Sequence, residues 1–367
     1  MNIYSRYLIG LLLLGIATIV AIFDFSEAKK INTFSPKNIA HFSVDRKVIG
    51  VSPKIIERAF ISKVQSFDNK DVIVLIGNSI AEGAGAVDRL YFSKQLAKDH
   101  NVINAGLGGD YAGASTALAT LGIAANHSTN HRSEYKIVII YPITRFYYHN
   151  SYWMSEGIKL LAKQMGLEDA VSKNGKNMNM EEAEQQDKKN FLYLNMRCAF
   201  NNAVLTEWID KKQVWCLKAL ATTISNPQFI KDNERYYSLR RTPDKIREDF
   251  KAITREVPAS KDNSASLLYV ISLLESYLNN NNITHQIYFL LTGYPSSAVN
   301  TLTQDEQAAL VDAENALLKE IQSRKPYWTT KSIKLANEEF YYDASHLNEL
   351  GQRKTAEIIL RTITSKN

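Results

Sequence analysis

The sequence predicts an α/β fold, specifically a three-layer, doubly wound and mostly parallel sheet of five strands. Two observations predict it. Segments with strand and helix patterns alternate along much of the chain, and the strand segments are continuous apolar runs. The clearest run, Val72–Ile76, contains only valine, leucine and isoleucine, as expected for a strand buried on both faces of a parallel sheet. We therefore expect helices on both faces of this sheet.

The first part of the chain supplies three strands and two helices. The predicted strands are 71–76, 101–104 and 136–141, and the predicted helices are 86–98 and 114–125. The second helix is rich in alanine and contains Gly122, a composition that suits close packing on a sheet. Pro142 marks the end of the third strand.

The alternation stops at Phe146 and resumes at about residue 263. This stretch is rich in Lys, Glu, Asn, Tyr and Met, and it shows helical patterns, as at 192–220, without a clear strand. We interpret 146–263 as a helical insertion over the carboxyl edge of the sheet, where it would cap a site, set substrate choice or dock a partner. Its polar segment 172–189 contains too few apolar residues to anchor itself.

The last third of the chain completes the sheet. Predicted helices at 264–278, 303–324 and 347–364 alternate with predicted strands at 285–292 and 332–335. Thr303 and Glu306 have the spacing of a capping box at the start of the second of these helices.

The N-terminal segment predicts a membrane anchor. Residues 7–23 are apolar apart from an occasional Thr or Tyr, a length between that of a signal-peptide core and a full span. We favour an uncleaved single-pass anchor at 1–30, although small residues at 26–28 also fit signal peptidase. Positive charge lies on both flanks, so charge alone does not orient the segment.

Composition excludes few function classes. The net charge of +6 suits attraction to an anionic envelope polymer or lipid surface, but the basic residues are scattered among acidic ones, as on most solvated surfaces. No nucleic-acid-binding motif occurs. Cys198 and Cys216 are able to pair in an oxidising compartment, but sequence spacing does not show whether they approach each other.

Two short motifs carry the chemistry. Gly77–Ser79 follows the first strand, and Asp343–His346 precedes the last helix. A serine hydroxyl is a weak nucleophile until an imidazole accepts its proton, and the imidazole needs an acceptor that fixes its tautomer. Ser79, His346 and Asp343 supply these three groups, at the edge of an α/β sheet where ligands bind.

With Asn104–Gly109, which has the pattern Asn-x-Gly-x-x-Gly, these motifs resemble the SGNH (GDSL-like) hydrolase and acyltransferase superfamily. The resemblance implies a flavodoxin-like domain over 31–367, interrupted by the insertion, with Ser79, Asp343 and His346 as catalytic triad. It further implies that the backbone N–H groups of Ser79 and Gly109 hold the oxyanion, each such donor being typically worth about 3 kcal/mol. Asn78 stands where the family commonly has Asp, and we place it beside the substrate.

One block departs from the family pattern. The third strand leads into 141–145, where no Asn is present to complete the oxyanion hole. Thr144, Arg145 or a tyrosine hydroxyl are the candidate replacements and substrate contacts, unless the hole contains two backbone donors only. The chain resembles the membrane-anchored branch of the superfamily in three features: the missing Asn, the predicted anchor and the sequence of 346–351. Members of this branch act in D-alanylation of teichoic acid and in O-acetylation of exported polysaccharide.

Each assignment has a purely structural alternative. Ser79 would cap the helix after the first strand, Asp343 would cap the last helix with His346 exposed in its first turn, and Gly106, Gly108 and Gly109 would only permit a tight turn. A phosphate loop at 77–85 is excluded because the Gly-Lys-Ser/Thr ending is absent, and a dinucleotide fingerprint at 106–111 is excluded by Tyr111.

No metal or other cofactor is expected. His127 and His131 are four residues apart, but they lie in a Ser/Thr/Asn-rich stretch with a loop pattern and without a third ligand nearby.

The expected function is extracytoplasmic, serine-dependent acyl transfer or ester hydrolysis. The resemblance implies an envelope polysaccharide or another acyl ester as substrate, and a membrane acyl exporter as partner. The sequence does not separate hydrolase from transferase. The alternative is a catalytically inactive SGNH-like module that binds or assembles an envelope complex through its insertion.

Overall fold

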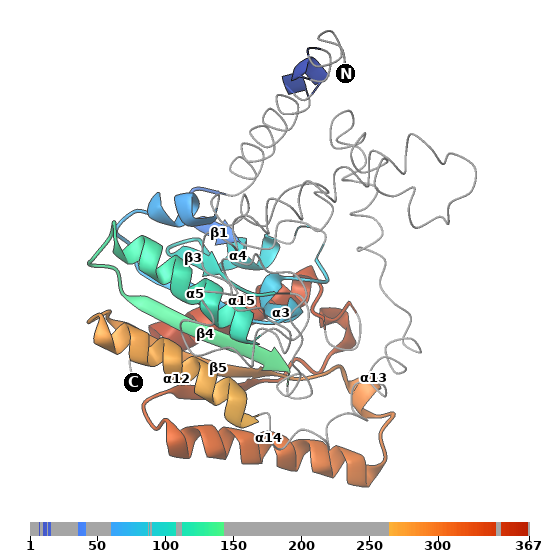
Figure 1. Ribbon diagram of the computed structural model, residues 1–367. Helices are drawn as coiled ribbons and strands as arrows, with labels where there is room; N and C mark the ends of the chain where they lie inside the picture. The colour runs from blue at the N-terminus through green and yellow to red at the C-terminus, as the bar shows by residue number, and fades with distance from the viewer. Residues whose placement is uncertain are drawn as a thin grey trace, which may run out of the picture.

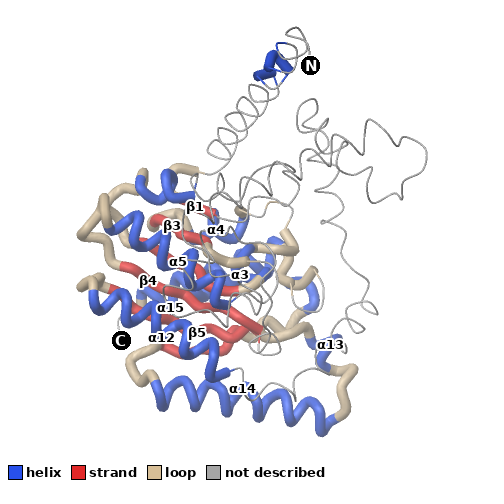
Figure 2. The backbone as a smooth tube through the Cα atoms, in the orientation of Figure 1, coloured by secondary structure: helices blue, strands red, loops and turns tan. Residues whose placement is uncertain are grey.

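The computed structural model describes residues 36–41, 60–86, 90–107, 112–142, 264–342 and 346–365, with isolated positions at 7, 10–12, 14, 15 and 88. At 112–114 and 264–270 it describes the backbone alone. The predicted insertion at 146–263, with its polar segment and both cysteines, lies outside these residues. The described part has an α/β architecture, with one parallel sheet between helices (Figures 1 and 2).

The sheet contains six strands in the described part of the chain, and not the predicted five. They are β1 (Ile39–His41), β2 (Val72–Gly77), β3 (Asn101–Asn104), β4 (Tyr135–Pro142), β5 (His285–Thr292) and β6 (Thr329–Ile333). Their order is β1-β3-β2-β4-β5-β6, and every neighbouring pair is parallel. The additional strand, β1, pairs with β3 at one edge, with Ile39 opposite Val102. Its three residues are too few to show a periodic pattern.

The described helices are α3 (Ser79–Glu82), α4 (Tyr91–Leu96), α5 (Ala112–His127), α12 (Ser264–Asn280), α13 (Ser296–Val299), α14 (Gln304–Arg324), the 3-10 helix η3 (Glu338–Phe340) and α15 (Glu349–Thr364). The helix predicted at 86–98 is the shorter α4. It starts later because the chain after α3 turns through Gly83 and Gly85, both at positive φ. The capping box that begins α14 is confirmed, since the Thr303 side chain and Glu306 each bond the other's backbone N–H.

Alternating side chains of each strand enter two separate cores. Val72, Val74 and Ile76 of β2 lie in the core under α5, α12 and α14, whereas Ile73 and Leu75 lie in the core under α4 and α15. This period of two places apolar residues on both faces, which explains why the strands are continuous apolar runs.

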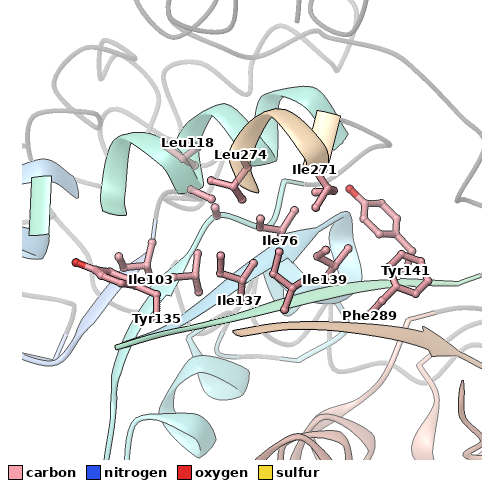
Figure 3. Close-up of a cluster of buried hydrophobic side chains, with 14 of the residues drawn as sticks. Ile76, Ile103, Leu118, Tyr135, Ile137, Ile139, Tyr141, Ile271, Leu274 and Phe289 are labelled. Carbon is pink, nitrogen blue, oxygen red and sulfur yellow. The ribbon is translucent and has the colours of Figure 1, made fainter. Parts of the chain in front are cut away.

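Figure 3 shows the first of these cores. Leu118 of α5 and Leu274 of α12 lie above the sheet, over strand residues that include Ile76 and Ile137. All four side chains are fully buried. The predicted placement of helices on both faces of the sheet is therefore confirmed for the described residues.

The strand order places a reversal of winding between β2 and β4. Without β1, the order β3-β2-β4-β5-β6 is the doubly wound order 2-1-3-4-5, in which the winding direction reverses between the first and third strands. Ligands of such sheets bind outside the carboxyl ends of the strands at this reversal. Residues that directly follow β2 are therefore in the favoured position for a site.

A buried ion pair joins α12 to the segment between α14 and β6. The carboxylate of Glu275 accepts hydrogen bonds from Lys325 Nζ at 2.7 Å and from Trp328 Nε1 at 3.0 Å. Burial alone would raise the pKa of Glu275, but hydrogen bonds from Lys325, Trp328 and Tyr327 outweigh it and hold this pKa below its ordinary value.

In the part of the chain that the structure describes, no helix combines the length and the apolar character needed to cross a membrane. The predicted anchor at 1–30 falls almost entirely outside that part, with only residues 7, 10–12, 14 and 15 described.

Candidate active site

Ser79 is the first residue of the short helix α3, immediately beyond β2. The cap of this helix is Asn78, whose Oδ1 accepts the N–H of Ile80 at 3.0 Å. The alternative that Ser79 serves as the helix cap is therefore wrong. Ser79 is half-buried.

The turn that holds Ser79 is fixed by bonds from neighbouring elements. The N–H of Gly77 donates to Ser115 Oγ of α5 at 3.0 Å, and the carbonyl of Gly77 accepts the N–H of Leu107 at 3.0 Å. These bonds tie the end of β2 to the face of α5 and to the chain after β3.

Asn104 connects the second sequence block to α3. Its fully buried Nδ2 donates to the carbonyl of Ala81 and to Ser93 Oγ, both at 2.9 Å, while its Oδ1 accepts the N–H of Gly106 at 2.9 Å. A Cβ at Gly106 would lie 2.4 Å from the backbone nitrogen of Glu82. Only glycine permits this close approach, so Gly106 has a packing role whatever the role of Gly109.

His346 lies in a tight loop ahead of α15. The loop is closed by the Tyr342 N–H, which donates to the His346 carbonyl at 2.8 Å, and by an antiparallel bridge between Tyr341 and Leu347. The cap of α15 is Asn348, whose Oδ1 accepts the N–H of Gly351 at 3.0 Å. The alternative in which Asp343 caps the last helix is therefore wrong, and His346 precedes the cap by two residues.

The fold brings the two motifs into direct contact. Ser79 Oγ and His346 Nε2 are 2.7 Å apart, although 267 residues separate them in the sequence. Both side chains are half-buried. If the imidazole carries its proton on Nδ1, Nε2 accepts the serine O–H, which is the direction needed for activation of the hydroxyl.

The roles of the other predicted site residues stay predictions. Asp343, Gly109, Thr144 and Arg145 lie outside the described residues, and their roles stay predictions. Asn78 is 3% exposed and uses its Oδ1 to cap α3, and a contact between Asn78 and substrate likewise stays a prediction.

Tyr341 supplies a buried hydroxyl beside the histidine loop. Its side chain is 1% exposed, and its hydroxyl has no hydrogen-bond partner among the described residues. Burial, with a smaller contribution from Tyr294, raises the pKa of Tyr341, so this group is a neutral O–H donor at any physiological pH.

Sequence reasoning missed two residues that shape this region, Asn348 and Gln352. Asn348 could have been found, because an Asn directly before a helical pattern is an N-cap signal. Gln352 gave no signal, because its contacts reach residues that are 268 and 269 positions away.

No group of three or more His, Cys, Asp or Glu side chains is arranged to hold a metal ion in the described segments. His127 and His131 contact each other edge to face, with ring centroids 5.2 Å apart. Burial and the neighbouring His131 lower the pKa of His127. His127 is the last residue of α5, and not a loop residue as its Ser/Thr/Asn-rich surroundings indicated.

No known family model and no curated protein matches this chain. The resemblance to the SGNH superfamily therefore stays a prediction from three short motifs.

Proposed function

We propose that this chain is a serine esterase or O-acyltransferase of the SGNH type, with Ser79 as nucleophile and His346 as general base. The observation that carries the proposal is the 2.7 Å contact between Ser79 Oγ and His346 Nε2. A nucleophile and its base need this hydrogen-bond distance. Ser79 lies just beyond β2, where the winding of the sheet reverses, and this position supports a ligand site.

The reaction proceeds in two steps that share these residues. Ser79 Oγ bonds to the carbonyl carbon of an ester or thioester while His346 Nε2 takes its proton, and this proton then passes to the leaving oxygen or sulfur as the acyl–heteroatom bond breaks. The resulting acyl-serine is attacked by a second hydroxyl, whose proton goes to His346 and then back to Ser79 Oγ. Water as the second nucleophile gives hydrolysis, and a sugar hydroxyl gives acyl transfer.

The Ser79 N–H supports the assignment of an oxyanion donor. Among the described residues no hydrogen bond to this N–H is found, while those of Ile80 and Glu82 bond to Asn78. A backbone N–H at this position is able to bind the negative charge that develops on the carbonyl oxygen. Gly109 is the proposed second donor, and Thr144 or Arg145 the proposed third.

Asp343 is the proposed orienting residue of the imidazole. The bond from the Tyr342 N–H to the His346 carbonyl closes a loop of five residues, and Asp343 belongs to this loop. The spacing of Asp343 and His346 in the sequence supports the triad.

The proposed substrate is an envelope polysaccharide or its acyl donor, on the extracytoplasmic side of a membrane. The proposed anchor at 1–30, with a membrane acyl exporter as partner, is supported by the large apolar side chains of Leu11, Leu12 and Leu14, each at least 65% exposed. A lipid bilayer would remove such side chains from water. A periplasm-specific reporter fused to the C-terminus should be active, and activity of only a cytoplasm-specific reporter would refute this location.

The catalytic proposal is tested by covalent labelling of the purified full-length chain in detergent. A fluorophosphonate should bond to Ser79 Oγ with loss of fluoride, and peptide mass spectrometry should find the adduct on the peptide that contains Ser79. Ser79→Ala should remove both the adduct and turnover of p-nitrophenyl acetate. The control Ser276→Ala, which changes an exposed serine of α12, should leave both unchanged.

If the folded wild-type chain neither labels nor turns over acetyl esters, the enzyme proposal is refuted. The inactive binding or assembly module then becomes the better account of the chain.

A further inference from the structure

We infer that Gln352 is a positioning residue that holds the His346 loop against residues 83–86, the segment that follows α3, an inference that rests on the function proposed above. Gln352 lies in the first turns of α15 and is 1% exposed. Its Nε2 donates to the carbonyls of Leu347 at 3.0 Å, of Gly83 at 2.9 Å and of Ala84 at 3.2 Å. Leu347 directly follows the histidine, whereas Gly83 and Ala84 directly follow α3, which begins at the serine.

The orientation of this carboxamide is determined by its neighbours. Three carbonyl oxygens surround one end of the side chain, so that end must be the NH2 group, because an oxygen there would face three other acceptors. The two protons of Nε2 are thus shared between both loops. One side chain on a helix therefore bonds both the segment that follows α3 and the residue that follows His346.

The opposite end of the side chain is also buried. Among the described residues its Oε1 has no hydrogen-bond partner, whereas its Nε2 has three. In this part of the chain the hydrogen bonds of Gln352 are therefore those of its donor end.

The backbones of the two loops are in direct contact where Gln352 bonds them. Gly85 has a φ of +98°, and a Cβ at this position would lie 2.5 Å from the Leu347 carbonyl oxygen and 3.2 Å from His346 Cβ. The separation of the loops is thus set by backbone contact and held by the carboxamide. Packing fixes the position of α15, since its residues Ala356, Ile359 and Ile363 are buried in the core between the sheet and α4 and α15.

Gln352→Leu tests the inference, because it keeps the approximate shape of the side chain and removes both donor protons. The matched control is Thr355→Val on the same helix. Thr355 is also fully buried, and its Oγ1 has no partner among the described residues. A second control, Ile359→Val, should lower the melting temperature without contact with either loop.

Fluorophosphonate labelling separates positioning from mere destabilisation. A misplaced imidazole should lower the maximal labelling rate at saturating probe by about 10- to 100-fold, with the half-saturating probe concentration and final extent of labelling unchanged. Loss of folded protein should instead lower the final extent of labelling. Thr355→Val and Ile359→Val should keep the wild-type rate constant. A wild-type rate constant in Gln352→Leu would overturn the inference.

Hydrogen–deuterium exchange provides a readout that does not depend on activity. In Gln352→Leu the amides of 84–86 and 342–348 should exchange at least tenfold faster than in the wild type, and those of α5 should not change. Unchanged exchange in both loops would overturn the inference even if labelling falls. If the wild type does not label at all while the loop exchange changes as expected, the proposed catalytic function fails and the bonding of the loops by Gln352 stands.

Discussion

Gly85→Ala is the substitution that most directly perturbs the contact between the segment that follows α3 and the His346 loop. The new Cβ would lie 2.5 Å from the Leu347 carbonyl oxygen, whereas ordinary contact begins at 3.4 Å. The Leu347 carbonyl must therefore retreat by about 0.9 Å, unless the Gly85 loop moves instead. The positive φ of Gly85 adds about 1–2 kcal/mol of backbone strain for alanine.

The displacement acts one residue away from the imidazole. A shift of this size would take Ser79 Oγ and His346 Nε2 from 2.7 Å to beyond the range of an O–H···N hydrogen bond. Loss of general-base assistance should then lower the labelling rate of Ser79 by about 100-fold, toward the lower end of what such assistance contributes. The unfolding free energy should fall by about 2 kcal/mol, mainly because of the strained φ and the steric contact.

Thermal unfolding and fluorophosphonate labelling of the same preparations provide the measurement. The matched control is Gly293→Ala, which follows β5 at the same edge of the sheet. Its new Cβ would lie 3.5 Å from the Ile333 carbonyl oxygen, an ordinary contact, so both stability and labelling should stay close to wild type. If Gly85→Ala folds and labels at the wild-type rate, the proposed dependence of activity on the spacing of the loops is refuted.

The remaining predictions concern the buried ion pair of Glu275. Glu275→Gln should lower the unfolding free energy at pH 7 by about 2 kcal/mol, because Lys325 loses its charged acceptor, whereas Glu320→Gln in the exposed pair with Arg324 should change it by about 0.5 kcal/mol or less. The pKa of Glu275 is lower in the folded than in the unfolded chain, so its stabilisation is complete above the unfolded pKa and is lost as pH falls through the folded pKa. Chemical denaturation from pH 7 to pH 3 should therefore show a shallower loss of stability in Glu275→Gln, and parallel curves for variant and wild type would contradict the assigned pair.

The long apolar elements were predictable from sequence because burial on both faces leaves a continuous pattern. The strands at 101–104 and 285–292 have the predicted bounds. β1 was missed because three residues carry no period, and α3 was missed because four residues complete only one helical turn. The last strand was predicted at 332–335 and lies at Thr329–Ile333, since its edge position leaves polar residues that show no apolar run.

The contact at the site was predictable in part. The order of the two short motifs led to the expectation that Ser79 meets His346, and the structure places their side chains in contact. The bonds that hold this contact were beyond sequence reasoning. Gln352 donates to the backbone carbonyls of residues 83 and 84. Because every residue has such a carbonyl, the sequence does not show which of them accepts a hydrogen bond.

The central claim is that Ser79 and His346 act as one catalytic unit. A double-mutant cycle on acetyl-ester turnover tests it most directly, with Ser79→Ala, His346→Ala and the double variant compared under the same conditions. We predict that each single variant falls to the same residual rate of ester turnover as the double variant. Without its base the serine accelerates the reaction little, and without the serine the base does not accelerate it at all. Independent losses that multiply in the double variant would contradict the account.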